Sequence, residues 1–168
     1  AAAVLVALLV GAYIGSPYYA VHSFRSAVQA GDVAGMEARV DFPAVRESLK
    51  SQISAQMTKA MAEDPALKDN PFSGMAAMML PAIIDRTIEA YVTPAGIAAV
   101  VKNTQLVPGK DAAASDGKVV SSSTYVSLNR FQVDVHPEKA PAIKSSMIFA
   151  RDGLFAWKLV RLDLPEGM

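Results

Sequence analysis

The N-terminal segment of the chain, from Ala1 to Val21, contains no aspartate, glutamate, lysine or arginine. Within it, the residues from Val4 to Val10 are all aliphatic. As a helix that rises 1.5 Å per residue, a run of this length extends roughly 30 Å, about the thickness of the hydrocarbon core of a bilayer. We therefore expect residues 1–15 to be a membrane anchor, the surviving portion of a signal-anchor helix.

Three tyrosines near the end of this segment, Tyr13, Tyr18 and Tyr19, fit the aromatic belt of a membrane–water interface. Two other interpretations of the segment stay open. A cleaved signal peptide needs small residues at its cleavage site, and Val10-Gly11-Ala12 is a tolerable match. A buried core helix of a soluble domain is the other, because apolar runs shorter than a full span are often buried in protein.

The composition of the chain restricts its function before any motif is considered. Hydrophobic residues make up 52% of the sequence, so residues 16–168 can bury the core of a single domain. The 16 Lys and Arg are matched by 16 Asp and Glu, which leaves no net positive charge to attract nucleic acid. Cysteine is absent, which excludes disulfides, thiolate zinc sites and thiol nucleophiles in this chain.

Residues 16–103 show the capping signals and the periodicity of helices. Ser16-Pro17 predicts a helix start, Gly31 a helix end, and Asp32 the start of a short second helix. Asp41 precedes the longest amphipathic pattern of the chain. The apolar positions of this pattern recur every three or four residues, at Phe42, Val45, Leu49, Ile53, Met57 and Met61.

A Met-rich helix is expected over residues 75–91, after a loop from Glu63 to Pro71. Its apolar residues cover more than one stripe, which predicts a mostly buried helix. Pro81 should kink this helix or mark its true start, because proline removes a backbone donor. Thr93-Pro94 repeats the cap-plus-proline signal and predicts one more short helix.

Beyond residue 103 the hydrophobic pattern changes from a helical to an alternating period. Phe131, Val133 and Val135 alternate with polar residues, as in a strand with one buried face, and residues 120–126 supply its expected partner. Asp152-Gly153 lies between two later apolar runs and is a two-residue hairpin signal. We therefore predict an α+β fold: the anchor helix, about four further helices, a loop at 109–117 and a four-stranded antiparallel β-meander over 118–165.

The chain carries no recognisable catalytic or cofactor motif. Its two histidines, His22 and His136, lack the spacing of metal ligands, and neither a phosphate-binding loop nor a Gly-x-Ser-x-Gly elbow occurs. We therefore expect no catalytic residue, no cofactor and no metal. The alternative is a small enzyme with a polar pocket, with His22 or Asp85 as the acid–base residue.

The Met-rich segment suggests an apolar binding surface, because flexible thioether side chains are common on adaptable interfaces. If this helix lies across the sheet, it forms a cleft with the buried face of the strands. The residues that we expect to line this helix–sheet cleft are Met75, Met79, Ile83, Phe131 and Trp157. The competing interpretation is that all five are ordinary core, since a helix this apolar is normally buried.

Motifs of one bacterial family are spread through nearly the whole chain. They are Ser16-Pro17-Tyr18-Tyr19-Ala20, Gly31-Asp32, residues 40–50, Tyr91-Val92-Thr93-Pro94, Asn129-Arg130-Phe131, residues 153–159 and Leu162-Asp163-Leu164-Pro165. The stretch around Asp41 and the terminal Trp-Lys-Leu are the specific parts. On these motifs the chain resembles the family known as domain of unknown function 2939. The resemblance implies an N-terminal anchor and a domain that faces the periplasm, with no assigned activity.

Helices followed by late antiparallel strands are also similar to the cone-shaped folds of the cystatins and of proteins related to nuclear transport factor 2. Likeness at the level of fold implies no function. The leading hypothesis is a non-enzymatic module at the bacterial inner membrane, with its domain in the periplasm. We expect it to bind an envelope protein or a small apolar ligand in the helix–sheet cleft. A further hypothesis makes the Met-rich helix 75–91 a lipid-contacting element.

Overall fold

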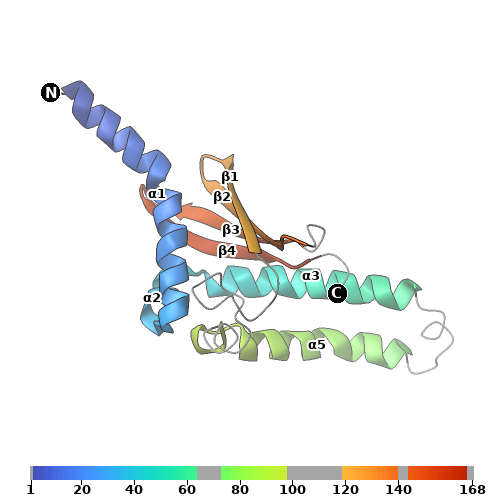
Figure 1. Ribbon diagram of the computed structural model, residues 1–168. Coiled ribbons are helices and arrows are strands. Elements are labelled where there is room, and N and C mark those ends of the chain that lie inside the picture. The colour runs from blue at the N-terminus through green and yellow to red at the C-terminus, as the bar shows by residue number, and fades with distance from the viewer. Residues whose placement is uncertain (1, 64–72, 98–118, 140–143, 166–168) are drawn as a thin grey trace.

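The computed structural model describes residues 2–63, 73–97, 119–139 and 144–165. The helices come first: α1 (Ala2–Ala30), α2 (Val33–Arg39), α3 (Phe42–Glu63) and α5 (Ser73–Tyr91). The strands follow: β1 (Val119–Ser127), β2 (Arg130–Pro137), β3 (Ser145–Asp152) and β4 (Ala156–Asp163). They form a four-stranded antiparallel sheet in the order β1-β2-β3-β4, which confirms the predicted α+β fold (Figure 1).

Some parts of the sequence-based prediction lie outside the described residues. The loop expected at 109–117 is one, and most of the loop expected before the Met-rich helix is another. The helix predicted after Thr93 is described only for its first turn, residues 94–97, where the Thr93 hydroxyl caps the backbone N–H of Gly96 at 3.0 Å. The cone-shaped fold type stays a prediction.

α1 is a single helix, so the prediction that a new helix starts at Ser16-Pro17 is wrong. Pro17 lies inside α1 and lacks the N–H that would bond to the carbonyl of Tyr13. The hydroxyl of Ser16 donates to that carbonyl instead, at 2.8 Å, which leaves no unpaired acceptor. The helix therefore continues through the proline, and its axis changes direction along its length (Figure 1).

The short connections after α1 carry the predicted caps. Gly31 adopts a positive φ of 66° at the end of α1, and the Asp32 carboxylate accepts from the N–H of Gly35 at 3.0 Å. Asp41 caps α3 in the same way by accepting from the N–H of Ala44 at 3.0 Å. These local hydrogen bonds satisfy donors that the first turn of a helix leaves free. They also turn the chain so that α3 lies against the edge of the sheet.

β4 is covered by the helical half of the chain. The N–H of Asp41 donates to the carbonyl of Leu159 at 2.9 Å, and Val40 forms a parallel bridge with the same residue. Further along α3, the Gln52 side chain donates to the carbonyl of Leu162 at 2.6 Å and accepts from the N–H of Leu164 at 3.0 Å. The amide of Gln52 thus completes hydrogen bonds that a neighbouring strand would otherwise make.

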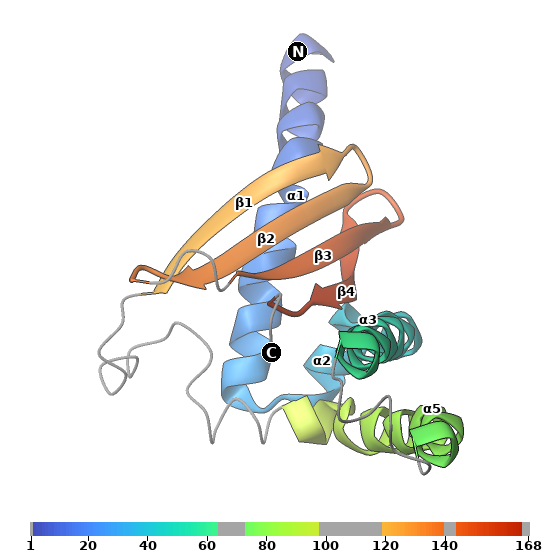
Figure 2. The same cartoon turned by 90° about the vertical axis from the view of Figure 1, so that its right-hand side faces the viewer.

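The core lies between one face of the sheet and the second half of α1. Figure 2 shows α1 crossing the strands on one side and α3 lying below β4. Phe131, Phe149 and Leu159 are almost fully buried on the covered face. The ring of Phe24 from α1 meets Phe149 edge-on, with centroids 5.7 Å apart. The alternation predicted for β2 is confirmed, since its apolar residues point to this core.

The β3–β4 hairpin occurs where it was predicted, but its turn is longer. Asp152 pairs with Ala156, so the turn contains Gly153, Leu154 and Phe155 rather than two residues. Gly153 has a φ of 91°, a conformation that other residues rarely adopt. Phe155 therefore lies in the turn and does not share a strand face with Trp157.

α5 packs on α3 and not across the sheet, so the prediction of a mostly buried Met-rich helix is wrong. Only Ile84 and Ile88 of its described side chains are buried. Pro81 lies within α5, eight residues after the helix begins at Ser73. The side of α5 that faces away from α3 therefore remains open.

Candidate functional site

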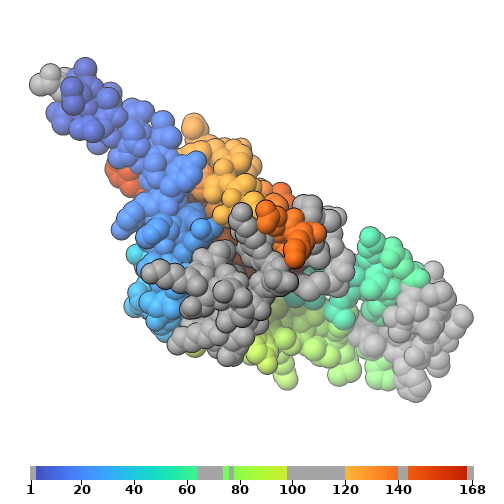
Figure 3. All heavy atoms as spheres, in the orientation of Figure 1, coloured from blue at the N-terminus to red at the C-terminus, as the bar shows by residue number. Residues whose placement is uncertain are grey.

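The first half of α1 is an exposed apolar rod. Its large side chains are between 51% and 65% exposed, and they are Val4, Leu5, Val6, Leu8, Leu9, Val10 and Ile14. In the space-filling view this part of α1 stands clear of the body of the protein (Figure 3). Among the described residues, one helix is long and apolar enough by length and composition to cross a membrane, and it is α1 over Ala3–Ala30.

The exposed part of α1 is shorter than the uncharged sequence suggests. Ser16, Ala20 and Val21 are buried against the domain, so only residues 2–15 project from it. At 1.5 Å per residue this projecting part extends roughly 21 Å, less than the thickness of a hydrocarbon core. The last third of the uncharged segment therefore belongs to the domain core and not to an anchor.

Ser16 joins the apolar rod to the sheet. Its hydroxyl accepts from the indole N–H of Trp157 at 2.8 Å, and this pair is buried. The phenol of Tyr125 donates to the carbonyl of Ile14, two residues before Ser16, at 2.6 Å. Burial raises the pKa of Tyr125, which the nearby positive charge of Arg151 partly offsets. Strands β1 and β4 thus hold the base of the rod by polar contacts.

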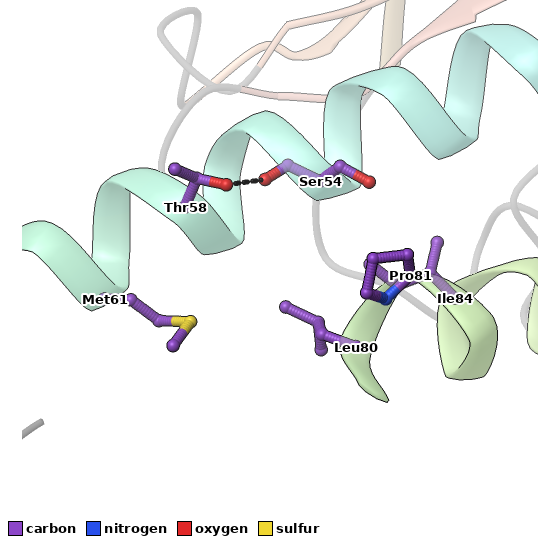
Figure 4. Close-up of a pocket in the computed structure, with 6 residues that line it drawn as sticks. All are labelled: Ser54, Thr58, Met61, Leu80, Pro81 and Ile84. Carbon is purple, nitrogen blue, oxygen red and sulfur yellow. Dashed lines mark hydrogen bonds between the residues drawn. The ribbon is translucent and has the colours of Figure 1, made fainter. Parts of the chain in front are cut away.

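A second candidate site is an apolar groove between α3 and α5. It has a volume of about 210 Å³ and is lined by Ser54, Thr58, Met61, Leu80, Pro81 and Ile84. Figure 4 shows the α3 side chains on one side and the α5 side chains on the other, with Thr58 bonded back to the carbonyl of Ser54 at 2.8 Å. Pockets for drug-sized ligands occupy roughly 300–1,000 Å³, so this groove fits a single apolar side chain better than a whole ligand.

Polar contacts at the other end of the helix pair hold α5 against α3. Lys50 contacts Asp85 at 3.2 Å and Glu89 at 3.4 Å, and Arg46 donates to the carbonyl of Val92 at 2.9 Å. The hydrogen bond that Lys50 donates to Asp85 is the main cause that raises the pKa of Lys50. The groove therefore lies beyond the clamped end, where α3 and α5 are held by side-chain packing.

The structure does not bring the five predicted cleft residues together. Phe131 and Trp157 lie inside the core under α1. Met75, Met79 and Ile83 are more than half exposed on the open side of α5, together with Met78 at 84%. We call these four residues the Met face. The predicted helix–sheet cleft does not form among these residues, because α3 and not α5 lies at the edge of the sheet. The structure has a groove between α3 and α5 instead.

The residues that line the groove were not predicted as a site. Met61 was assigned to the apolar face of α3 and Leu80 to the Met-rich helix, but nothing local in the sequence pairs them. One signal was present in the sequence. The apolar stripe of α3 continues to Met57 and Met61, beyond the length of helix that a short sheet can cover, which indicates a second partner for α3.

The histidines and Asp85 do not converge on a catalytic arrangement. His22 is exposed on α1, where it borders a shallow polar hollow with Ser23 and Arg39. Asp85 is exposed on α5 and paired with Lys50. Within the described residues, no group of three or more His, Asp or Glu gathers as for a metal ion.

One carboxylate on the open face of the sheet is held by several donors. Asp134 accepts from Ser146 at 2.6 Å and from Gln132 at 2.7 Å, and it pairs with Lys144 at 2.8 Å. Burial raises its pKa, but these three donors together lower the pKa of Asp134 below its ordinary value. The three described side chains that contact this carboxylate stabilise its charge, which suits a structural anion better than a general base.

The architecture defines a small α+β protein with an exposed apolar N-terminal helix. The family model for protein of unknown function (DUF2939) matches residues 6–100, more than half of the chain, so the chain belongs to this family. The match covers the apolar rod from residue 6 onward, the rest of α1, and α2, α3 and α5, and therefore includes the groove and the Met face. Comparison with curated proteins and with solved structures finds no match.

Proposed function

We propose that this protein is a non-enzymatic module of the bacterial envelope, anchored in the inner membrane by the apolar rod with its domain in the periplasm. We further propose that it binds a partner protein along the groove and the Met face. The observation that carries the proposal is the apolar rod: consecutive turns of helix with exposed large apolar side chains and no charge.

The many exposed apolar side chains of the rod favour a lipid environment. Transfer of one large aliphatic side chain out of water contributes roughly 1.5–3 kcal/mol, so the rod as a whole gains on the order of 10 kcal/mol. Its backbone polar groups are paired within the helix, which is what a bilayer requires. Water is therefore the least favourable surrounding for this part of the chain.

The Met face supports a protein partner more than a lipid one. It lies at the opposite end of the molecule from the apolar rod (Figure 1), so a bilayer that surrounds the rod does not reach it. The groove beside it accepts one apolar side chain, and methionines adapt to the shape of a partner. A protein that docks on α5 and inserts one side chain between α3 and α5 satisfies both features.

The absence of cysteine allows a direct test of location. A single cysteine at the exposed Lys59 is the probe, in cells that express the full chain with Lys59→Cys. We expect a membrane-impermeant maleimide to label it in spheroplasts and the protein to remain in the membrane fraction after an alkaline wash. Labelling only after lysis would place the domain in the cytoplasm and contradict the proposal.

The partner site is tested by photocrosslinking from Met78, the most exposed residue of the Met face. We expect a discrete adduct with an envelope protein when a photoreactive phenylalanine replaces Met78, and none from Ser122 on the sheet. Ser54→Trp fills the groove and should abolish the adduct. Ala55→Trp places the same ring on the adjacent exposed position of α3 and should not. Equal adducts with both tryptophan variants would remove the groove from the proposal.

A further inference from the structure

Arg151, at the end of β3, joins three separate parts of the protein. Its guanidinium donates to the carbonyl of Leu128 at 3.1 and 3.2 Å and to the carbonyl of Leu154 at 2.6 Å. The same group lies 3.7 Å from the ring centroid of Tyr13 and 4.3 Å from that of Trp157. The β1–β2 turn, the β3–β4 turn and the base of the apolar rod therefore meet at one side chain.

Both turns present exposed apolar side chains at this meeting point. Leu128 is 75% exposed and Leu154 is 71% exposed, and Val126 and Phe155 are exposed beside them. We call these four residues the collar. Figure 2 shows both turns at the same end of the sheet, close to the level where the N-terminal part of α1 rises above it. Four exposed apolar side chains grouped on two turns form a patch of the kind that marks an interaction site.

The distance between the collar and the apolar rod is fixed because there is no linker between them. Ile14 is 54% exposed, and Ser16, two residues later in the same helix, is 8% exposed. The polar contacts of Ser16 and the stacking of Tyr13 hold this stretch of helix to the sheet. A bilayer that surrounds the rod down to Ile14 therefore reaches the turns themselves.

The charges around the collar suit the surface of a bilayer that contains anionic lipid. Arg130 and Arg151 flank the two turns, and Lys158 follows the second of them. The one carboxylate of these segments, Asp152, is neutralised by Lys158 at 2.9 Å. At such a surface the cations would contact the lipid phosphates, and the exposed leucines would reach the acyl chains just below them.

We propose that the collar inserts into the bilayer that surrounds the apolar rod, as a second membrane contact that fixes the orientation of the domain. The occupant of this surface is the lipid of that same bilayer. The inference rests on the proposed anchoring of α1 and deepens it. The rod holds the domain at the membrane, and the two turns fix the orientation of the domain relative to the membrane plane. The groove and the Met face then point away from the membrane.

The test uses spin labels on single cysteines in the full chain, reconstituted in nanodiscs of phosphatidylethanolamine and phosphatidylglycerol. The positions are Leu128→Cys and Leu154→Cys in the collar, Leu9→Cys in the rod and Lys59→Cys as the water-exposed control. Accessibility to oxygen relative to a nickel chelate reports depth in the bilayer. We expect this ratio to be severalfold higher at the two collar positions than at Lys59, and highest at Leu9.

Failure of the collar and failure of the anchor give different results. A lipid-like ratio at Leu9 with water-like ratios at 128 and 154 overturns the collar and leaves the anchor in place. A water-like ratio at Leu9 overturns the anchor and the inference together. Protection of 128 and 154 from both reagents means that protein covers the turns, and this also overturns the collar. All labelled positions are exposed, so the substitutions should not disturb the fold. Circular dichroism of each variant checks this.

Discussion

The protein exposes two apolar regions, the rod of α1 and the Met face of α5, and they differ in what surrounds them. The rod has no charged residue on any side, whereas α5 carries Asp85, Arg86 and Glu89 within the same helix. Among the described helices, only α1, the helix that carries the rod, meets the length and composition of a membrane span. Exposure alone therefore does not identify the solvent of a helix. The distribution of charged residues around the helix identifies it. A helix surrounded by lipid carries no unpaired charged side chain on any side, whereas a helix in water can carry one apolar stripe.

The largest expected effect separates a buried residue of the predicted cleft from an exposed residue of the Met face. Phe131→Ala removes a fully buried ring and should lower the free energy of unfolding by about 3–5 kcal/mol. Met78→Ala on the Met face should change it by less than about 0.5 kcal/mol. Urea denaturation of both variants measures the difference. A large loss in the Met78 variant would show that α5 packs against something in the free protein.

The second prediction contrasts the two apolar regions directly. Leu8→Arg places a charge in the rod and costs about 3 kcal/mol near the centre of a bilayer, so much of the protein should leave the membrane fraction. Met78→Arg adds the same charge to α5 and should leave membrane association unchanged. Membrane pellets after an alkaline wash, quantified by immunoblot, give both values. Equal release by the two substitutions would mean that both regions contact lipid.

A third prediction concerns the base of the rod. Tyr125→Phe removes the hydrogen bond to the carbonyl of Ile14 and should lower stability by about 1 kcal/mol. Since the pKa of Tyr125 is raised above 10.0 in the folded state, its contribution is present below that pH and is lost as the pH rises through the folded value. The difference between the two proteins in chemical denaturation should therefore shrink in alkaline buffer. A constant difference would mean that the phenol does not donate to α1.

The smallest effect is expected at the clamp of α5. Lys50→Gln removes the ion pairs with Asp85 and Glu89, which are exposed and screened by salt. We expect faster amide hydrogen exchange in α5 and little change in α1, with global stability nearly unaltered. Because high salt screens the same pairs, it should reproduce the effect in the unmodified protein. Faster exchange in both helices would indicate that they unfold as one unit.

The parts of the fold that the sequence predicted correctly depend on neighbours along the chain. Asp32 and Asp41 cap helices because each carboxylate reaches an N–H three residues ahead. The alternation in β2 follows from the geometry of any strand with one covered face. Such signals need no knowledge of the tertiary structure, so they hold in this protein as in others.

The errors involve partners that are distant in sequence. Ser16-Pro17 has the pattern of a helix start, but the indole of Trp157 and the carbonyl of Tyr13 use the Ser16 hydroxyl within a continuous helix. The Met-rich segment has the composition of a core helix, yet α3 already occupies the edge of β4 through Gln52. Composition shows how apolar a helix is. It does not show which surface of the fold that helix packs against.

The uninterrupted course of α1 has a consequence for how the domain is aimed. A helix turns by about 100° per residue. The number of residues between the lipid-facing part of α1 and the part that contacts the sheet therefore sets the direction in which the groove points around the membrane normal. Insertion of one residue before Tyr13 would swing the groove by more than a quarter turn relative to the lipid-facing side of the rod.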